Sequence, residues 1–316
     1  MRVLITGAGG FVGKHLLDAI SAKTEHEIFA TALDEREAAN IDLPVDHITL
    51  IDITDKKAVE ELFERVKPEQ IYHLAAQSSV GLSWKIPALT LRVNIEGTVN
   101  ILEAMRSQNM ENSKILLIGS AEQYGAVTAA DLPIREEQAV VAGNPYAISK
   151  IAQEQLAAVY KDAYGLKVCI VRAFNHIGTG QRPDFVISDW AHQIVEIERG
   201  EKEPKLLVGN IKVRRDFTDV RDIVRAYMLI MEKGESGQIY NVGSGKRISL
   251  EELLQTMISL SNRKDIAVEV DQAKVRAVDI EDLVADNRKL IEATGWEKTI
   301  PLEQTLTDIL NSLRRM

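Results

Sequence analysis

Two residues four places apart could transfer a proton. Tyr146 and Lys150 stand in the segment Tyr-Ala-Ile-Ser-Lys, and residues at i and i+4 lie on one face of a helix. A neighbouring ammonium favours the phenolate form of a tyrosine and lowers its pKa from about 10. We therefore expect Lys150 to lower the pKa of Tyr146, which makes the phenol an acid or base near neutral pH.

A serine stands where a neighbouring strand is expected to end. Ser120 lies in Ile-Gly-Ser-Ala-Glu-Gln-Tyr-Gly, residues 118–125. A hydroxyl at this point can donate a hydrogen bond to a substrate oxygen and orient that oxygen toward Tyr146. A serine that only caps the strand end is the other interpretation.

Three glycines near the start of the chain indicate a nucleotide site. Gly7, Gly10 and Gly13 stand between an apolar strand, residues 3–6, and a segment of helical periodicity, residues 11–22. Gly7 allows a tight turn, Gly10 lets the backbone approach a pyrophosphate, and Gly13 lets the helix pack closely on the sheet. The helix amino terminus adds free N–H groups and a partial positive charge.

Alternating strands and helices must position these residues. We expect strands at 3–6, 27–33, 47–51, 70–75, 115–120, 166–173 and 238–242, and helices at 11–22, from 55, 87–108, 146–163, 188–199, after 222, 250–260 and from 301. This alternation predicts an α/β fold whose doubly wound parallel (Rossmann) sheet is covered on both faces.

The pattern changes after Phe174, where segments become shorter and richer in Gly and Pro. We expect residues 1–174, with about 222–243, to form an NAD(P)-binding Rossmann domain. Residues 175–221 and 244–316 are expected to form a smaller C-terminal substrate-binding domain. Ligands bind at the carboxyl ends of the strands in such sheets, so the site should lie between the two domains.

Composition narrows the class of protein. The 316 residues are 45% hydrophobic and 27% charged. The net charge is −9, and no cluster of basic residues stands out in the sequence. Nucleic acid and anionic membranes are therefore disfavoured as partners. The single cysteine, Cys169, excludes an internal disulfide, and its apolar neighbours predict a core position. No apolar run reaches the ~18 residues of a membrane helix and no signal peptide is visible, so a cytoplasmic enzyme is expected.

Together these motifs resemble the extended, sugar-nucleotide-modifying branch of the short-chain dehydrogenase/reductase superfamily. The resemblance implies hydride transfer with NADPH or NADH as the cofactor. Tyr146 would pass a proton to the substrate oxygen, Ser120 would hold that oxygen, and Lys150 would also contact the nicotinamide ribose. In related 4,6-dehydratases a Glu at the position of Glu122 removes a proton beside the keto group. Glu122 is therefore the fourth candidate catalytic residue, with ion pairing as its alternative role.

The resemblance also implies a set of cofactor-binding residues. Asp52 resembles the acid that binds adenine. Asp34 could accept hydrogen bonds from the adenosine ribose and favour NAD, whereas Arg36 would suit a 2′-phosphate, so the cofactor preference stays open. The expected set is Gly7, Gly10, Phe11, Val12, Gly13, Asp34, Asp52, Ile53, Leu74, Ala75, Ala76, Asn94, Tyr146, Lys150 and Phe174.

Two later segments narrow the substrate. Residues 172–181 and 207–222 resemble those of GDP-mannose 4,6-dehydratases and GDP-6-deoxy-D-mannose reductases. The resemblance implies that Arg215 and Arg276 clamp a diphosphate, which the planar guanidinium suits. Arg214 is expected to be a solvated surface charge. The expected substrate-binding residues are Ser120, Asn175, Val186, Arg215 and Arg276.

The expected activity is reduction of the 4-keto group of GDP-4-keto-6-deoxy-D-mannose to GDP-D-rhamnose. The alternatives are GDP-mannose 4,6-dehydratase, another nucleotide-sugar 4,6-dehydratase and a 4-epimerase. A dinucleotide sensor without turnover ranks low, because Ser120, Tyr146 and Lys150 are all present. The resemblance further implies a homodimer paired through helices near residues 98–108 and 146–160. No metal site is expected.

Overall fold

The computed structural model describes residues 1–23, 25–275 and 280–316. At its centre is a seven-stranded sheet with the order β10-β6-β5-β4-β1-β2-β3, and every neighbouring pair is parallel. The strands are β1 (Arg2–Thr6), β2 (Glu27–Ala32), β3 (Ile48–Leu50), β4 (Gln70–His73), β5 (Lys114–Ser120), β6 (Lys167–Ala173) and β10 (Ile239–Val242). The chain builds outward from β1 to β3 and then crosses to the other side of β1. The expected doubly wound parallel sheet is therefore confirmed.

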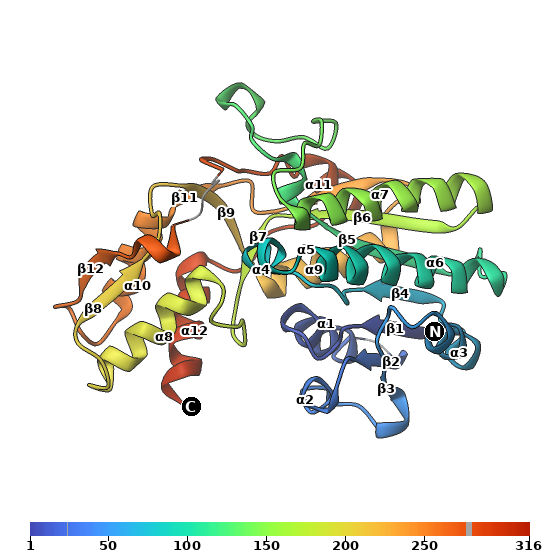
Figure 1. Cartoon of the computed structure of the whole chain (residues 1–316), viewed down its shortest axis with the longest axis horizontal. Coiled ribbons are helices and arrows are strands. Elements are labelled where there is room, and N and C mark those ends of the chain that lie inside the picture. Colours follow the sequence, from blue (N-terminus) through green and yellow to red (C-terminus); the bar gives the residue numbers. More distant parts are fainter. Residues whose placement is uncertain (24, 276–279) are drawn as a thin grey trace.

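Helices cover both faces of this sheet (Figure 1). One face carries α1 (Phe11–Ser21), α9 (Val220–Lys233) and α11 (Arg288–Thr294), and the other carries α3 (Lys56–Val66), α6 (Gly97–Ser107) and α7 (Pro145–Tyr164). Successive side chains of a strand point to opposite faces. Val3 and Ile5 of β1 accordingly pack with the first group, and Leu4 packs with the second. Cys169 is buried in the first core, as expected.

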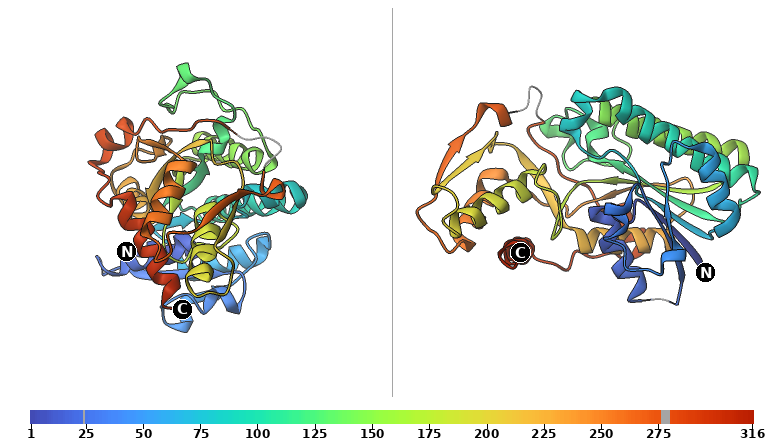
Figure 2. Two further views of the ribbon diagram at one scale, coloured as in Figure 1. Left: turned by 90° about the vertical axis from the view of Figure 1, so that its left-hand side faces the viewer. Right: turned by 60° about the horizontal axis from the view of Figure 1, so that its bottom comes forward.

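A smaller unit lies beyond one end of the sheet (Figure 2). It contains a three-stranded sheet, β11-β9-β7, and a two-stranded sheet, β12-β8. Its elements are β7 (Asn175–Ile177), α8 (Val186–Glu198), β8 (Lys205–Val208), β9 (Arg214–Asp219), β11 (Arg247–Ser249), α10 (Leu250–Leu260), β12 (Ala267–Val270) and α12 (Leu302–Arg314). All of these elements except the exposed strand β12 contribute to a core around the fully buried Trp190. In contrast, α11 packs against α9 and β10 of the large unit.

The helix expected over residues 87–108 is interrupted. The structure has α4 (Val80–Lys85), which was not expected, then α5 (Pro87–Leu91), a π-helical turn at Arg92–Glu96, and α6. The wider turn contains the buried Asn94, whose Nδ2 donates to Ser149 Oγ of α7 at 2.8 Å. Turns of this kind are frequent at functional sites. The interruption thus ties an expected cofactor-binding residue to the helix that carries Tyr146.

Candidate active site

The carboxyl ends of four parallel strands bring the candidate residues to one edge of the sheet. Thr6 of β1 pairs with His73 of β4, and Ser120 of β5 pairs with Ala173 of β6. The segments that follow these strands are the glycine-rich loop, residues 74–76, the turn after Ser120, and Phe174. Residues far apart in the sequence therefore meet at one place, which is where open α/β sheets bind ligands.

The glycine-rich loop has the shape and the donors that a pyrophosphate needs. Gly7 has a φ of 67°, and a Cβ on it would lie 2.8 Å from Ala75 Cα. A Cβ on Gly13 would collide with the carbonyl oxygen of Gly7, so the helix start also requires a glycine. α1 begins after Gly10, which has no side chain to cap the first N–H groups. These observations fit a dinucleotide phosphate at the start of α1.

The chain after β2 forms the wall where an adenosine ribose is expected. Asp34 is exposed, and its Oδ1 accepts a hydrogen bond from the Glu37 N–H at 2.9 Å, which caps the short helix α2 (Glu35–Ala38). The Glu37 carboxylate accepts from the Leu33 N–H at 3.0 Å. Gly9 of the glycine-rich loop fits closely against the Glu37 backbone. Carboxylates therefore surround this wall, with Arg36 as an exposed cation beside them.

The remaining cofactor candidates lie around the same edge. Asp52 is exposed, and its Oδ1 accepts hydrogen bonds from the N–H and the hydroxyl of Thr54, each at 2.9 Å. Ile53 is buried against Gly97, where a Cβ would collide with its side chain. Ala75 donates its N–H to Thr6 Oγ1 at 3.2 Å. Each contact holds a candidate segment in place at the strand ends.

Tyr146 and Lys150 lie in the first two turns of α7, and both are buried. The Lys150 Nζ donates to the Ile118 carbonyl oxygen of β5 at 2.9 Å and lies 5.7 Å from the centroid of the Tyr146 ring. Burial raises the pKa of Tyr146, a contact with the Ser120 hydroxyl lowers it, and the charge of Glu122 raises it. Burial also lowers the pKa of Lys150 to about 7.

The expectation that Lys150 lowers the pKa of Tyr146 is therefore wrong. The geometry explains the error, because the ammonium is anchored on a β5 carbonyl and desolvation dominates the phenol. A phenol with a raised pKa keeps its proton at neutral pH. Tyr146 is thus suited to act as a general acid.

A buried polar network behind the site was not expected from the sequence. His73 lies between two hydroxyl groups, with Nδ1 2.8 Å from Thr6 Oγ1 and Nε2 3.2 Å from Thr98 Oγ1. Gln153 of α7 donates to the same Thr98 oxygen. Burial and the charge of Lys150 lower the pKa of His73 to about 3, so the imidazole is neutral. This network joins the glycine-rich loop to α7. In the sequence it was indicated only by polar residues at the ends of apolar strands.

The smaller unit carries the expected substrate-binding residues Asn175, Val186 and Arg215. Asn175 is exposed at the start of β7, and Val186 is exposed at the start of α8. Arg215 is buried in β9 and donates from Nη1 to the Arg214 carbonyl at 2.9 Å, whereas Arg214 itself is exposed, as expected. Arg276 lies outside the described residues.

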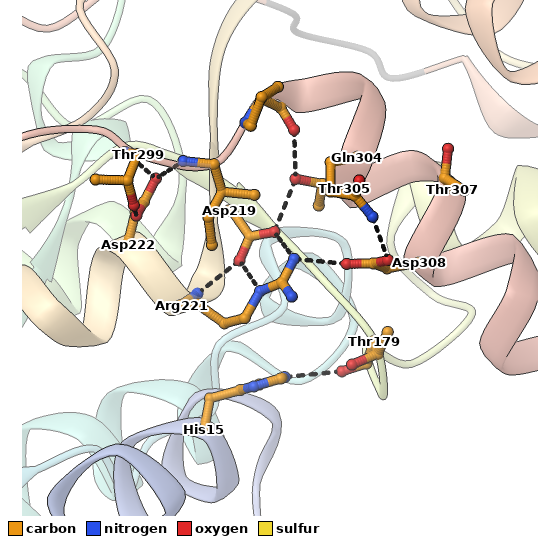
Figure 3. A network of polar contacts seen from close by, with 12 residues as sticks. His15, Thr179, Asp219, Arg221, Asp222, Thr299, Gln304, Thr305, Thr307 and Asp308 are labelled. Carbon is orange, nitrogen blue, oxygen red and sulfur yellow. Dashed lines mark hydrogen bonds and ion pairs between the residues drawn. The ribbon is translucent and has the colours of Figure 1, made fainter. Parts of the chain in front are cut away.

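Polar and aromatic contacts join the two units next to the glycine-rich loop. His15 of α1 donates to the Thr179 carbonyl at 2.9 Å, and Phe11 stacks on His176 with ring centroids 6.1 Å apart. Figure 3 shows the His15 contact beside a second network at the start of α9. There Arg221 binds the carboxylates of Asp219 and Asp308 (2.7 Å each), which ties α12 to β9 and the start of α9. The residues that flank the expected cofactor loop thus also contact the smaller unit.

Two classes of site find no support in the described part of the chain. Within those residues, no group of three or more His, Cys, Asp or Glu side chains could hold a metal ion. Nor does any described helix have the length and apolar character that crossing a membrane requires.

Comparison with known proteins places the chain among nucleotide-sugar enzymes. A family model described as GDP-mannose 4,6 dehydratase matches residues 4–309. The chain is 35% identical to GDP-6-deoxy-D-mannose reductase of Pseudomonas aeruginosa, covering 98% of this chain and 96% of that protein. The solved structure of RMD from Pseudomonas aeruginosa complexed with NADPH is 34% identical, with a TM-score of 0.87 and 99% of each chain covered. The UDP-glucose 4-epimerase of Thermus thermophilus in complex with NAD is 30% identical, with a TM-score of 0.87 and 99% of each chain covered.

Proposed function

The chain belongs to the GDP-mannose 4,6-dehydratase family of extended short-chain dehydrogenases/reductases, and from this premise we propose that it reduces a GDP-linked 4-keto sugar. The substrate is GDP-4-keto-6-deoxy-D-mannose, the product is GDP-D-rhamnose, and NADPH or NADH is the reductant. The observation that carries the proposal is a buried Tyr146, whose pKa is raised by burial, beside Ser120 at the end of β5. The long match to a GDP-6-deoxy-D-mannose reductase supports the same substrate.

The reaction needs one hydride and one proton. The nicotinamide supplies the hydride to the carbonyl carbon when the cofactor is bound. Tyr146 donates its phenolic proton to the oxygen as that oxygen gains negative charge. The Ser120 Oγ accepts a hydrogen bond from the Glu122 N–H at 3.2 Å, and its own proton, which contacts Tyr146 in the structure, can turn to the same oxygen. The Lys150 Nζ is held on the Ile118 carbonyl oxygen, 5.7 Å from the centroid of the Tyr146 ring, and so lies near the phenolate that is left.

The smaller unit would bind the nucleotide. Arg215 is buried in β9, and it carries the planar donor set that suits phosphate oxygens. With Asn175 and Val186 it forms our proposed substrate wall, and Arg276 is the second proposed diphosphate ligand. We retain the division into a Rossmann domain and a substrate-binding domain as part of this proposal, with α11 assigned to the Rossmann side.

Purified protein given GDP-4-keto-6-deoxy-D-mannose tests the proposal directly, with GDP-mannose as the parallel substrate. We expect stoichiometric oxidation of NADPH or NADH with the keto sugar alone. Formation of a keto sugar from GDP-mannose without net cofactor oxidation would make the protein a dehydratase. No reaction with either substrate would refute both activities and direct the search to other nucleotide sugars.

We also propose a homodimer that buries the outer face of α7. Ile148 and Val159 on this helix are 50% and 59% exposed, and Leu89 of the neighbouring α5 is 49% exposed. Exposed apolar groups gathered on one face are typical of an interface. Sedimentation should give twice the chain mass of 35.2 kDa, and a monomer at micromolar concentration would contradict the dimer. A cytoplasmic location stays a prediction from the sequence.

A further inference from the structure

Glu122 contacts the segments that carry both candidate catalytic hydroxyl groups. It lies in a single 3-10 turn, Ala121–Tyr124, directly after β5, and its side chain is half-buried. Its N–H donates to Ser120 Oγ at 3.2 Å, and its carboxylate Oε2 accepts from Asn144 Nδ2 at 2.9 Å. One residue therefore links the end of β5 to the start of α7.

Asn144 connects Glu122 to the first turn of α7. It is the N-cap of α7, and its Oδ1 accepts a hydrogen bond from the Ala147 N–H at 2.8 Å. Because Ala147 uses the amide oxygen and Glu122 uses the amide nitrogen, the Asn144 side chain has one defined orientation. Tyr146 lies in the turn that this cap closes, so a change at Glu122 reaches Tyr146 through two hydrogen bonds.

The segment that connects β5 to α7 folds back onto the 3-10 turn that contains Glu122. The Val141 N–H donates to the Gln123 carbonyl at 2.9 Å, and Gly125 leaves room for the Val141 carbonyl, which a Cβ would strike. The Gln123 side chain in turn accepts from the Ser120 N–H at 2.8 Å. These contacts hold the 3-10 turn in place, so the Glu122 carboxylate is in a fixed position to accept the hydrogen bond from Asn144.

We infer that Glu122 is a positioning residue, whose carboxylate holds the Asn144 cap and thereby sets Tyr146 opposite Ser120, without exchanging a proton with the substrate. The inference rests on the proposed reduction. Reduction of a ketone needs one proton donor, which is Tyr146, whereas a base beside the keto group is needed only when a proton leaves the neighbouring carbon, as in the elimination of water. The negative charge of Glu122 also raises the pKa of Tyr146 and helps the phenol keep its proton.

Three variants separate the hydrogen bond from the charge. Glu122→Gln keeps an oxygen that accepts from Asn144 but removes the charge and the basicity. Asn144→Asp keeps the cap on Ala147 but removes the donor and places two carboxylates side by side. The double variant Glu122→Gln, Asn144→Asp restores the pair with reversed polarity, because a Gln Nε2 can donate to an Asp oxygen.

The kcat and KM of each variant are measured with GDP-4-keto-6-deoxy-D-mannose and NADPH. Glu122→Gln should lower kcat only about threefold, and the loss of kcat at high pH should move to lower pH, since Tyr146 loses a neighbouring negative charge. Asn144→Asp should lower kcat at least about tenfold through misplacement of Tyr146, with the KM for NADPH unchanged. The double variant should recover most of this loss, which independent structural damage would not do.

Two results would overturn the inference. The first is a loss of about a hundredfold or more in Glu122→Gln without rescue in the double variant, which is the size of a lost general base. The second is deuterium from D₂O at C5 of the product with the wild-type protein but not with Glu122→Gln, because only a base at that carbon exchanges its proton. Failure of the wild-type protein to oxidise either cofactor would instead refute the proposed reduction. Hydrogen exchange of the Ala147 amide tests separately whether Glu122 and the Asn144 cap are coupled. A double variant whose Ala147 amide exchanges as fast as in Asn144→Asp would exclude this coupling.

Discussion

The Lys150 ammonium lies 5.7 Å from the centroid of the Tyr146 ring while it donates to a carbonyl of β5. Both side chains are buried, and burial favours the neutral form of each. It raises the pKa of Tyr146 and lowers that of Lys150 to about 7. Tyr146 therefore keeps its proton at neutral pH and can give it to an oxygen, which is the direction that ketone reduction requires.

Tyr146→Phe should remove this proton with little effect on packing. We expect kcat to fall about a thousandfold, while NADPH binding followed by fluorescence stays unchanged. Tyr160→Phe is the matched control, since its hydroxyl donates to Glu103 at 2.6 Å near the other end of α7. A Tyr146→Phe protein with more than about a tenth of the wild-type rate would contradict the role of general acid.

Asp34 should set the preference between the two cofactors. We expect its carboxylate to repel an adenosine 2′-phosphate, and a Ser in its place can still cap α2. Asp34→Ser should therefore shift the ratio of kcat/KM about tenfold toward NADPH. Asp55→Ser is the control, because Asp55 caps α3 in the same way through the Ala58 N–H. An unchanged ratio in Asp34→Ser would show that Asp34 does not face the ribose.

Arg215 and Arg214 are neighbours in β9 with opposite exposure, so they form a matched pair. Arg215→Gln should raise the KM for the GDP-sugar about tenfold or more, because a charge-assisted contact to the diphosphate is lost. The KM for NADPH should stay the same. Arg214→Gln should leave both values close to those of the wild type. Equal effects of the two substitutions on the sugar KM would exclude the assigned role of Arg215.

Much of the fold was predictable because its signals are local. The glycine spacing at Gly7, Gly10 and Gly13 and the short apolar strands each follow from neighbouring residues, and the structure agrees with them. The Tyr146–Lys150 spacing also predicted correctly that the two side chains would be neighbours. Glycine packing and helix periodicity are properties of a few consecutive residues.

The features that the sequence did not predict depend on tertiary contacts, which the spacing of residues along the chain does not encode. The pKa of Tyr146 is set by burial under the whole site, so the sign expected from Lys150 alone was wrong. The π-helical turn around Asn94 arises from contacts with Gln77 and Ser149, which lie 17 and 55 residues away. The role of Asn144 likewise appears only when β5 and α7 are placed side by side.

Breaking the buried ion pair between Arg172 and Glu154 should strongly destabilise the fold. Two hydrogen bonds of 2.6 and 2.9 Å join the pair, and the side chains are 4% and 7% exposed. Arg172→Met leaves a buried carboxylate without its cation and should cost about 3 kcal/mol in urea unfolding. Arg92→Met is the control, since its pair with Glu96 is exposed and contributes less than about 0.5 kcal/mol. A cost in Arg172→Met no larger than in the control would contradict this expectation.

Glu198 should make stability depend on pH through the C-terminal helix. Burial raises its pKa, but hydrogen bonds from Arg314, the Asn262 N–H and the Ser261 hydroxyl outweigh burial and lower the pKa from 4.5 to about 2. A carboxyl with a lowered folded-state pKa stabilises the fold above its unfolded pKa, and this contribution is lost as the pH falls toward about 2. Glu198→Gln should therefore lower the free energy of unfolding by about 2 kcal/mol at neutral pH. Its unfolding free energy should also fall less steeply between about pH 5 and 2. Glu196→Gln, on the same helix and in an exposed pair with Lys202, should keep the wild-type slope, and equal slopes for Glu198→Gln and the wild type would contradict the assignment.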